Sequence, residues 1–176
     1  AQLFFALTIS LAIFTSASWR NATAPTIADG GRLRRLCAVT TGLIYVQIVF
    51  GAVLRHTGER LDSHLLFAVF VAVHVVLVGM RFSRHHAAIA AVARPALYLF
   101  LLLLAQIVLG TASYLSKFAG LWVVSFDAIV LLTTSHLAVG ALMLASAIAL
   151  TLQAHRLSTF PAVGHHSSKV LAEQFS

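Results

Sequence analysis

Residues 46–51 read Val-Gln-Ile-Val-Phe-Gly, and residues 105–110 read Ala-Gln-Ile-Val-Leu-Gly. The two stretches share the pattern Gln-Ile-Val-x-Gly, and each lies in an apolar run. A second apolar run follows each copy and carries a His-Leu pair, His64-Leu65 in the first case and His136-Leu137 in the second. The chain therefore contains two copies of one helix pair, and two such pairs pack naturally as an antiparallel four-helix bundle.

The composition indicates an integral membrane protein. The 176 residues are 60% hydrophobic and 10% charged, whereas a soluble domain carries roughly 25% charged residues. The net charge of +7 would favour nucleic-acid binding in a soluble protein. Here the arginines lie in short loops between apolar runs, so we expect no nucleic-acid partner. The single cysteine, Cys37, excludes an intrachain disulfide and is predicted to be a packing residue.

Five apolar segments are predicted to be transmembrane helices, giving an all-α membrane protein whose last four helices form the bundle. A span needs about 20 residues, and backbone groups in hydrocarbon must be hydrogen-bonded within their own segment. The segments are approximately 1–16, 36–55, 64–80, 95–115 and 128–154. Pro95 is expected at the first helical position of its segment, where its missing N–H is harmless. Asp62 and Asp127 are expected at helix N-termini, which favour a carboxylate.

These segments divide the chain into four parts: a transmembrane helix at 1–17, a basic cytoplasmic loop at 18–35, the bundle at 36–156 and a polar tail at 157–176. The first segment lacks an initiating Met and a basic leader. We therefore interpret it as a helix whose beginning lies upstream, and the chain as a fragment of a longer protein.

The charges of the loops predict the orientation in the membrane. One set of loops carries nine cations, Arg20, Arg32, Arg34, Arg35, Arg81, Arg84, Arg94, Arg156 and Lys169. The opposite loops carry Arg55, Arg60 and Lys117, which Glu59, Asp62 and Asp127 offset. By the positive-inside rule, the first set and the C-terminus are cytoplasmic.

Ionisable residues inside a membrane span indicate function, and His64 and His136 are the preferred pair because each lies on the second helix of its repeat. Two neutral imidazoles that face each other are suitable axial ligands for haem iron. Imidazole also binds zinc and copper, but no third ligand of the Cys, Asp or Glu type lies at matching depth, which disfavours zinc. The alternative is that each histidine donates a hydrogen bond to a carbonyl of the next helix.

Further residues are candidates for contact with such a cofactor. Haem propionates are anionic, and Arg55, together with His56 and Arg60 at the same helix end, is expected to pair with them; Lys117 is a second candidate, and the alternative is interfacial anchoring. His74 is about 80° around the helix from His64, so it is expected to serve packing. Gln47 and Gln106 are expected to hydrogen-bond across helices, and Gly51 and Gly110 to let helices approach closely.

The sequence resembles the haem A synthase family. The resemblance rests on residues 47–58, Gln-Ile-Val-Phe-Gly-Ala-Val-Leu-Arg-His-Thr-Gly, followed by Leu-Asp-Ser-His-Leu-Leu at 61–66. Residues 106–110 and Thr-Ser-His-Leu-Ala-Val-Gly-Ala-Leu at 134–142 extend it, as does Ala-Gln-Leu-Phe-Phe at 1–5. It covers the chain up to about Arg156. The long motif is fairly specific, and the His-Leu pairs alone are weak.

The resemblance implies an eight-helix parent in a bacterial plasma membrane, made of two four-helix halves. The 1–17 helix would be the last helix of the first half, and the bundle would be the second half, with haem b ligated by His64 and His136. The family oxidises the C8 methyl of haem O to the formyl group of haem A. The parent would be an oxidoreductase whose catalytic residues lie in the absent first half, so activity of this part alone is doubtful. The implied partners are haem, haem O synthase and a quinone or other electron acceptor, and a homo-oligomer is compatible with it.

Two other readings stay open. The first is a stand-alone membrane cytochrome b with two histidine ligands that acts in electron transfer. The second is a haem-free membrane protein such as a transporter or an assembly factor. A transporter typically has helices broken at mid-membrane, and the four bundle segments show no such Gly/Pro break.

Overall fold

The computed structural model describes residues 2–21, 30–85, 88–117, 119 and 125–159. Within these ranges the chain is almost entirely helical and contains no strand. The helices are α1 (Gln2–Thr15), α2 (Ala17–Asn21), α3 (Gly30–Thr57), α4 (Leu61–His85), α5 (Ala90–Lys117) and α6 (Phe126–Thr159).

Four of these helices, α3 to α6, are long and apolar enough to cross a membrane. This supports the prediction of a membrane protein. Helix α1 has 14 residues, which corresponds to about 21 Å of helix against a hydrocarbon core of about 30 Å. The predicted count of five spans is therefore not confirmed in the part of the chain that the structure describes.

All four long helices begin earlier than the sequence predicted, and the difference is largest for α3 and α5. Helix α3 begins at Gly30 rather than near residue 36, so its first turns include arginines that were assigned to a loop. Helix α5 begins at Ala90, and Pro95 lies inside it, so the prediction that Pro95 opens the helix was wrong. The Ile89 carbonyl accepts hydrogen bonds from the N–H groups of Val92 and Ala93 and starts the helix before the proline. The predicted loop at 18–35 is helical at 18–21 and 30–35, and residues 22–29 and the tail from 160 lie outside the described residues.

A tight turn places the start of α4 beside the end of α3. Gly58 ends α3 with a positive φ of 76°, and its N–H donates to the Leu54 carbonyl at 2.9 Å. Such a left-handed residue is a usual helix terminator. Arg60 also has a positive φ, of 67°, and its carbonyl accepts the N–H of His64 at 3.0 Å. Asp62 and Asp127 lie in the first turns of α4 and α6, as expected.

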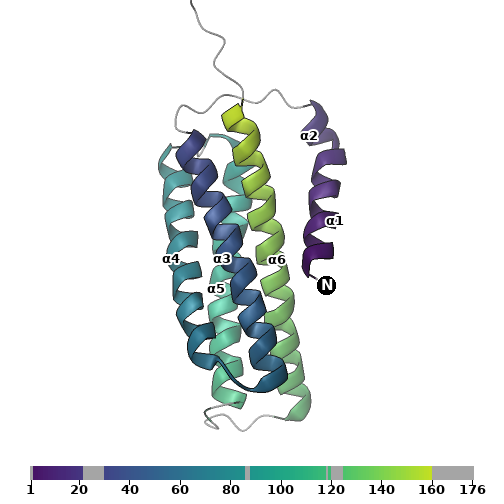
Figure 1. Ribbon diagram of the computed structural model, residues 1–176, viewed down its shortest axis with the longest axis vertical. Coiled ribbons are helices and arrows are strands. Elements are labelled where there is room, and N and C mark those ends of the chain that lie inside the picture. Colours follow the sequence, from purple (N-terminus) through teal and green to yellow (C-terminus); the bar gives the residue numbers. More distant parts are fainter. Residues whose placement is uncertain (1, 22–29, 86–87, 118, 120–124, 160–176) are drawn as a thin grey trace, which may run out of the picture.

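The four long helices lie side by side, and consecutive helices run in opposite directions (Figure 1). Helix α1 packs on the outside of α6. Beyond α1, the Trp19 ring of α2 lies 4.8 Å from the Arg156 guanidinium of α6. The arginine-rich ends of α3 to α6 lie together at the top of Figure 1. This is the distribution of charge that the positive-inside rule describes for one face of a membrane.

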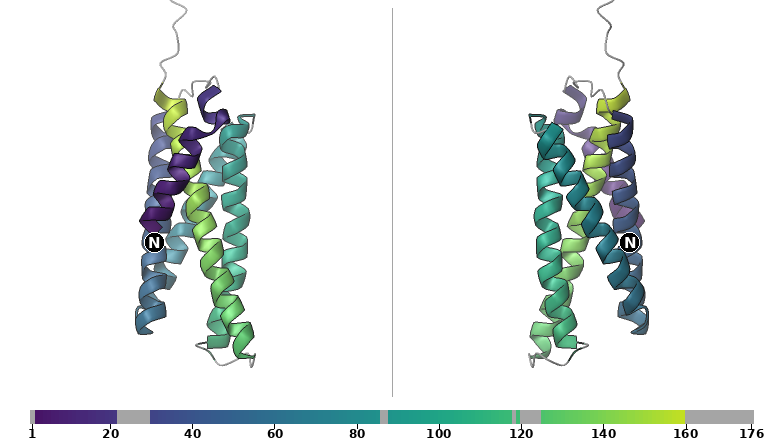
Figure 2. Two further views of the ribbon diagram at one scale, coloured as in Figure 1. Left: turned by 90° about the vertical axis from the view of Figure 1, so that its right-hand side faces the viewer. Right: turned by 90° about the vertical axis from the view of Figure 1, so that its left-hand side faces the viewer.

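The helices are closely packed at the arginine-rich end and separate toward the other end. Figure 2 shows α3 and α4 diverging as a pair from α5 and α6. The buried core lies mainly toward the arginine-rich end and includes Leu33, Cys37, Val75, Val78, Phe82, Val92, Leu99, Leu144, Leu150 and Ala154. Thr41 of α3 and Thr151 of α6 share a hydrogen bond of 2.8 Å there. The core therefore holds the four helices together at the arginine-rich end, called here the closed end. At the opposite, open end it leaves space between the α3–α4 pair and the α5–α6 pair.

Leu99 provides a test of this core. It is fully buried, whereas Leu104 on the same helix is 47% exposed on the outer surface. We expect Leu99→Ala to lower the free energy of unfolding by about 2 kcal/mol or more, because a cavity remains, and Leu104→Ala to have a much smaller effect. Unfolding of the detergent-solubilised protein, followed by circular dichroism, measures both. Equal losses in the two variants would contradict the placement of the core.

Candidate functional site

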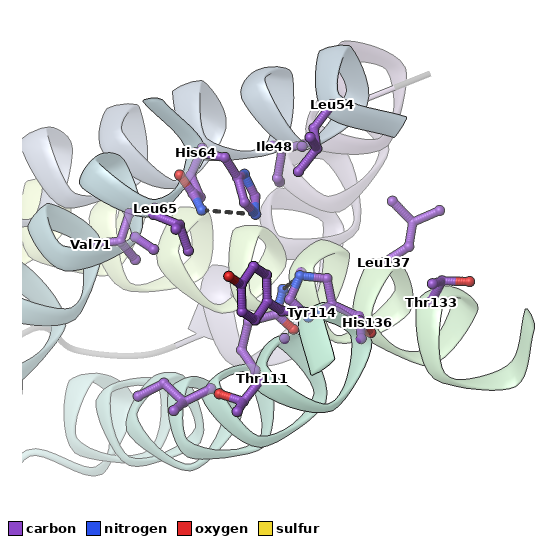
Figure 3. A pocket seen from close by; sticks show the side chains of 18 of the residues that line it. Ile48, Leu54, His64, Leu65, Val71, Thr111, Tyr114, Thr133, His136 and Leu137 are labelled. Carbon is purple, nitrogen blue, oxygen red and sulfur yellow. Dashed lines mark hydrogen bonds between the residues drawn. The ribbon is translucent and has the colours of Figure 1, made fainter. Parts of the chain in front are cut away.

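His64 and His136 face each other across the space between the two helix pairs. His64 lies in the first turn of α4, and His136 lies in the N-terminal half of α6. Both side chains are half-buried. Their ring centroids are 6.5 Å apart, with the ring planes at 72°, and they point toward one another from opposite sides of the pocket (Figure 3). A transition metal bonds an imidazole nitrogen at about 2.0–2.1 Å, so two rings that share one metal from opposite sides have centres roughly 6 Å apart. The observed separation fits that arrangement.

A glycine of the preceding helix lies against each imidazole. A Cβ placed on Gly51 would lie 3.2 Å from Cε1 of His64, and one placed on Gly110 would lie 3.0 Å from Cε1 of His136. Both distances are shorter than ordinary carbon–carbon contacts, which begin near 3.5 Å. The sequence predicted that these glycines allow close helix approach. The structure adds that the histidine ring itself occupies the space that a side chain would fill.

A glutamine of the same preceding helix contacts each histidine. The Nε2 atoms of Gln47 and His64 are 3.4 Å apart, and those of Gln106 and His136 are 3.5 Å apart. These contacts are longer than the usual 2.7–3.2 Å of a hydrogen bond and are correspondingly weak. The glutamines contact the neighbouring helix, as predicted, and in both copies the partner is the histidine.

Four polar atoms of this group are buried without a hydrogen-bond partner. They are Oε1 of Gln47, Nδ1 of His64, Oε1 of Gln106 and Nδ1 of His136. Most buried polar groups in proteins are satisfied, and exceptions often mark a functional site. The four atoms are two pairs of equivalent atoms, one pair from each copy of the repeat. Both copies therefore bury polar groups at the same place, which a single chance substitution would not produce.

A cavity of about 380 Å³ surrounds the histidine pair, within the range of roughly 300–1,000 Å³ that is usual for small-molecule sites. All four long helices contribute to it. Its wall is mostly apolar and includes Ile44, Ile48, Leu61, Leu65, Val71, Leu103, Ile107, Leu137 and Met143. Arg55, Tyr114 and Lys117 line it at the C-terminal ends of α3 and α5.

Not all predicted residues meet at this cavity. Arg55 and Lys117 line it, whereas His56 is exposed at the end of α3 and is not among the lining residues, and neither is Arg60. His74 bonds the Phe70 carbonyl of its own helix through Nδ1 at 2.9 Å, in keeping with a packing role.

Sequence reasoning missed four polar residues of the cavity wall, Thr111, Ser113, Tyr114 and Thr133. Tyr114 follows Gly110 by the same interval as Arg55 follows Gly51, so the repeat contained a signal that could have identified it. Ser113 has a buried Oγ without a hydrogen-bond partner and also lines the cavity; no pattern in the sequence marks it.

The arrangement can hold one metal with two nitrogen ligands. Within the described ranges, no cluster of three or more His, Cys, Asp or Glu side chains could hold a metal ion. A metal between His64 and His136 would therefore take its remaining ligands from outside this set of side chains, such as water, the glutamine oxygens or a cofactor.

Gly110 provides a test of the contact between glycine and imidazole. In a helix, Gly→Ala is normally stabilising by up to about 1 kcal/mol, and Gly42, which has no atom near an added Cβ, should show that gain. We expect Gly110→Ala to lack the gain and to shift the NMR signals of the His136 ring, which Gly42→Ala leaves unchanged. An unshifted His136 ring in Gly110→Ala would refute the contact.

No family model, curated protein or solved structure matches this chain.

Proposed function

We propose that the chain binds haem b between His64 and His136 and serves as the electron-transferring second half of a membrane protein of the haem A synthase type. One observation carries the proposal: repeat-related imidazoles face each other with ring centroids 6.5 Å apart in a cavity lined by all four long helices. The resemblance of residues 47–58 and 61–66 to the family supplies the identity of the cofactor.

The residues present fit this group. The two imidazoles provide axial nitrogens, the apolar wall suits the porphyrin faces, and the glycines leave room beside the rings. Haem b, when bound, supplies a one-electron iron couple. The protein's own contribution is to fix the two rings, to exclude water from most of the cavity, and to offer cations at one end.

Arg55 and Lys117 are proposed to receive the carboxylates of the cofactor. Both line the cavity where α3 and α5 end, and cations pair well with carboxylates. His56 lies one residue beyond Arg55 on the surface and is kept as a secondary candidate.

The proposed setting is a bacterial plasma membrane, crossed by α3 to α6 as an antiparallel four-helix bundle. The arginine-rich end and the C-terminal tail would face the cytoplasm. The histidine pair then lies in the outer half of the bilayer, and the carboxylates point to the outer surface.

Oxidation of the haem O methyl group, and partners such as haem O synthase and a quinone, belong to the proposed parent and not to the residues described. The stand-alone cytochrome b is the second candidate, because a complete two-histidine site lies within these four helices. The coding sequence upstream of residue 1 separates the two. Three further helices with two further histidines favour the synthase, and their absence favours the cytochrome.

The histidine pair is tested by spectroscopy. We expect the protein, expressed with ample haem and purified in detergent, to show the reduced-minus-oxidised spectrum of a six-coordinate haem b. His64→Ala and His136→Ala should each abolish it, because one axial ligand is lost. His74→Ala is the matched control, since His74 bonds its own helix, and should keep the spectrum.

A haem-free protein, or haem retained with an unchanged spectrum in both ligand variants, would overturn the proposal. In that case the glutamine contacts would make His64 and His136 packing residues.

Arg55 tests the orientation of the cofactor. We expect Arg55→Gln to release haem roughly three- to tenfold faster, as loss of a partly exposed charge-assisted hydrogen bond predicts. Arg60→Gln, which removes an exposed cation that does not line the cavity, should release haem at the original rate. Transfer of haem to excess apomyoglobin measures both rates. Identical rates in the two variants would exclude the pairing.

A further inference from the structure

We propose that the cavity opens sideways into the lipid between α4 and α5, and that haem enters and leaves through this gap. The inference rests on the proposed function for the identity of the ligand. The gap, called here the α4–α5 opening, is bordered by Leu65 of α4 and Ile107 of α5.

The two bordering residues line the cavity and are also half exposed, which is the combination expected at the rim of an opening. Each lines the cavity, yet Leu65 is 49% exposed and Ile107 is 51% exposed. A side chain that lines a cavity and is also half exposed lies at its rim. In a membrane, the exterior at this position is hydrocarbon, because the neighbouring exposed side chains Leu66 and Val108 are also apolar.

The helix geometry widens the gap at this place. Helix α4 packs on α5 less extensively than α3 packs on α6. The right-hand view of Figure 2 shows that α4 begins beside α3 at the bottom and approaches α5 only toward the top. The buried residues of α4 are Val71, Val75, Val78 and Phe82, all in the part toward the closed end, so the first turns of α4 lack tight packing against α5.

The repeat creates a second, equivalent gap between α3 and α6, but that side is more closed. Its bordering residues are Ile48 and Leu137, which occupy the positions of Ile107 and Leu65 in the other copy. Leu137 is 46% exposed, but Ile48 is partly buried and packs against the core. Helix α1 lies along α6 on this side of the molecule (Figure 2). The α4–α5 side carries no further described helix.

The chemistry of the ligand agrees with a lateral route. A porphyrin is flat and apolar except for its carboxylates, so it partitions into the bilayer, with the carboxylates at the surface. Entry edge-on between Leu65 and Ile107 brings the apolar ring to the histidines without crossing water. Arg55 and Lys117 can meanwhile meet the carboxylates at the outer end of the cavity.

The internal repeat supplies matched variants for the test. Leu65→Trp combined with Ile107→Trp narrows the α4–α5 opening, and Leu137→Trp combined with Ile48→Trp makes the same changes on the other side. The apoprotein in liposomes receives haem dissolved in the lipid, and the absorbance band reports uptake. Transfer to excess apomyoglobin reports release, and the final haem content reports occupancy.

We expect the α4–α5 tryptophan variant to take up and release haem about tenfold more slowly than the α3–α6 tryptophan variant, because only the first narrows the proposed passage. The α3–α6 variant, whose two residues also line the cavity, controls for the effect of the added rings on the cavity wall and on the final haem content. Leu65→Ala with Ile107→Ala should accelerate both processes, which guards against a variant that is merely misfolded.

Equal rates in the two tryptophan variants, or slowing only in the α3–α6 variant, would overturn the lateral route while leaving the haem site in place. If the protein without substitutions takes up no haem, the proposed function is overturned, and the lateral route with it.

Discussion

The contact between a glycine backbone and a histidine ring is repeated in both halves of this bundle, and the arrangement of the site depends on it. Gly51 and Gly110 have no side chain, and the imidazole of the following helix occupies the space beside each. A Cβ added at these glycines would lie only 3.2 Å and 3.0 Å from Cε1 of the histidine. The ring of a histidine is rigid beyond χ2, so its position follows from the helix on which it packs. Because each pair builds the same contact, the two rings arrive at corresponding places and face each other.

The bundle has a closed end and an open end because the contacts between the two helix pairs are concentrated at one end. In a bilayer, apolar surface gains little from helix association, and dispersion contacts and hydrogen bonds between helices are what hold them together. The closed end concentrates both, with interlocked Val, Leu and Ala side chains and the bond between Thr41 and Thr151. At the open end, each pair is joined by a long contact between glutamine and histidine, and α3 and α4 are joined also by the rings of Phe50 and Phe67, whose centroids are 4.9 Å apart. The pairs are therefore free to stand apart around a cavity.

Much of this could be predicted from the sequence, and the failures have physical causes. Hydropathy predicted five transmembrane helices, and four of them are long apolar helices in the structure, whereas the first is the 14-residue α1. The repeat singled out His64 and His136, whose rings the structure places 6.5 Å apart, because a polar side chain in an apolar repeat has few alternative explanations. The start of α3 was missed because arginines at a membrane surface continue a helix as well as they end it. Pro95 was misplaced because a proline near a helix start is tolerated beyond the first position. The divergence of the helix pairs depends on packing between the repeats, which no local pattern records.

The repeat is symmetric at the histidines but not at the rim of the cavity, and this difference bears on function. The position that Arg55 occupies in the first copy holds Tyr114 in the second, and Lys117 comes from only one copy. Two equivalent imidazoles cannot distinguish the two faces of a bound macrocycle, whereas an uneven rim can. A cation on α3, a phenol and a cation on α5 present different partners to the two carboxylates of a porphyrin. In the proposed haem site, the symmetric part would fix where iron lies, and the asymmetric part would select how the ring around it is turned.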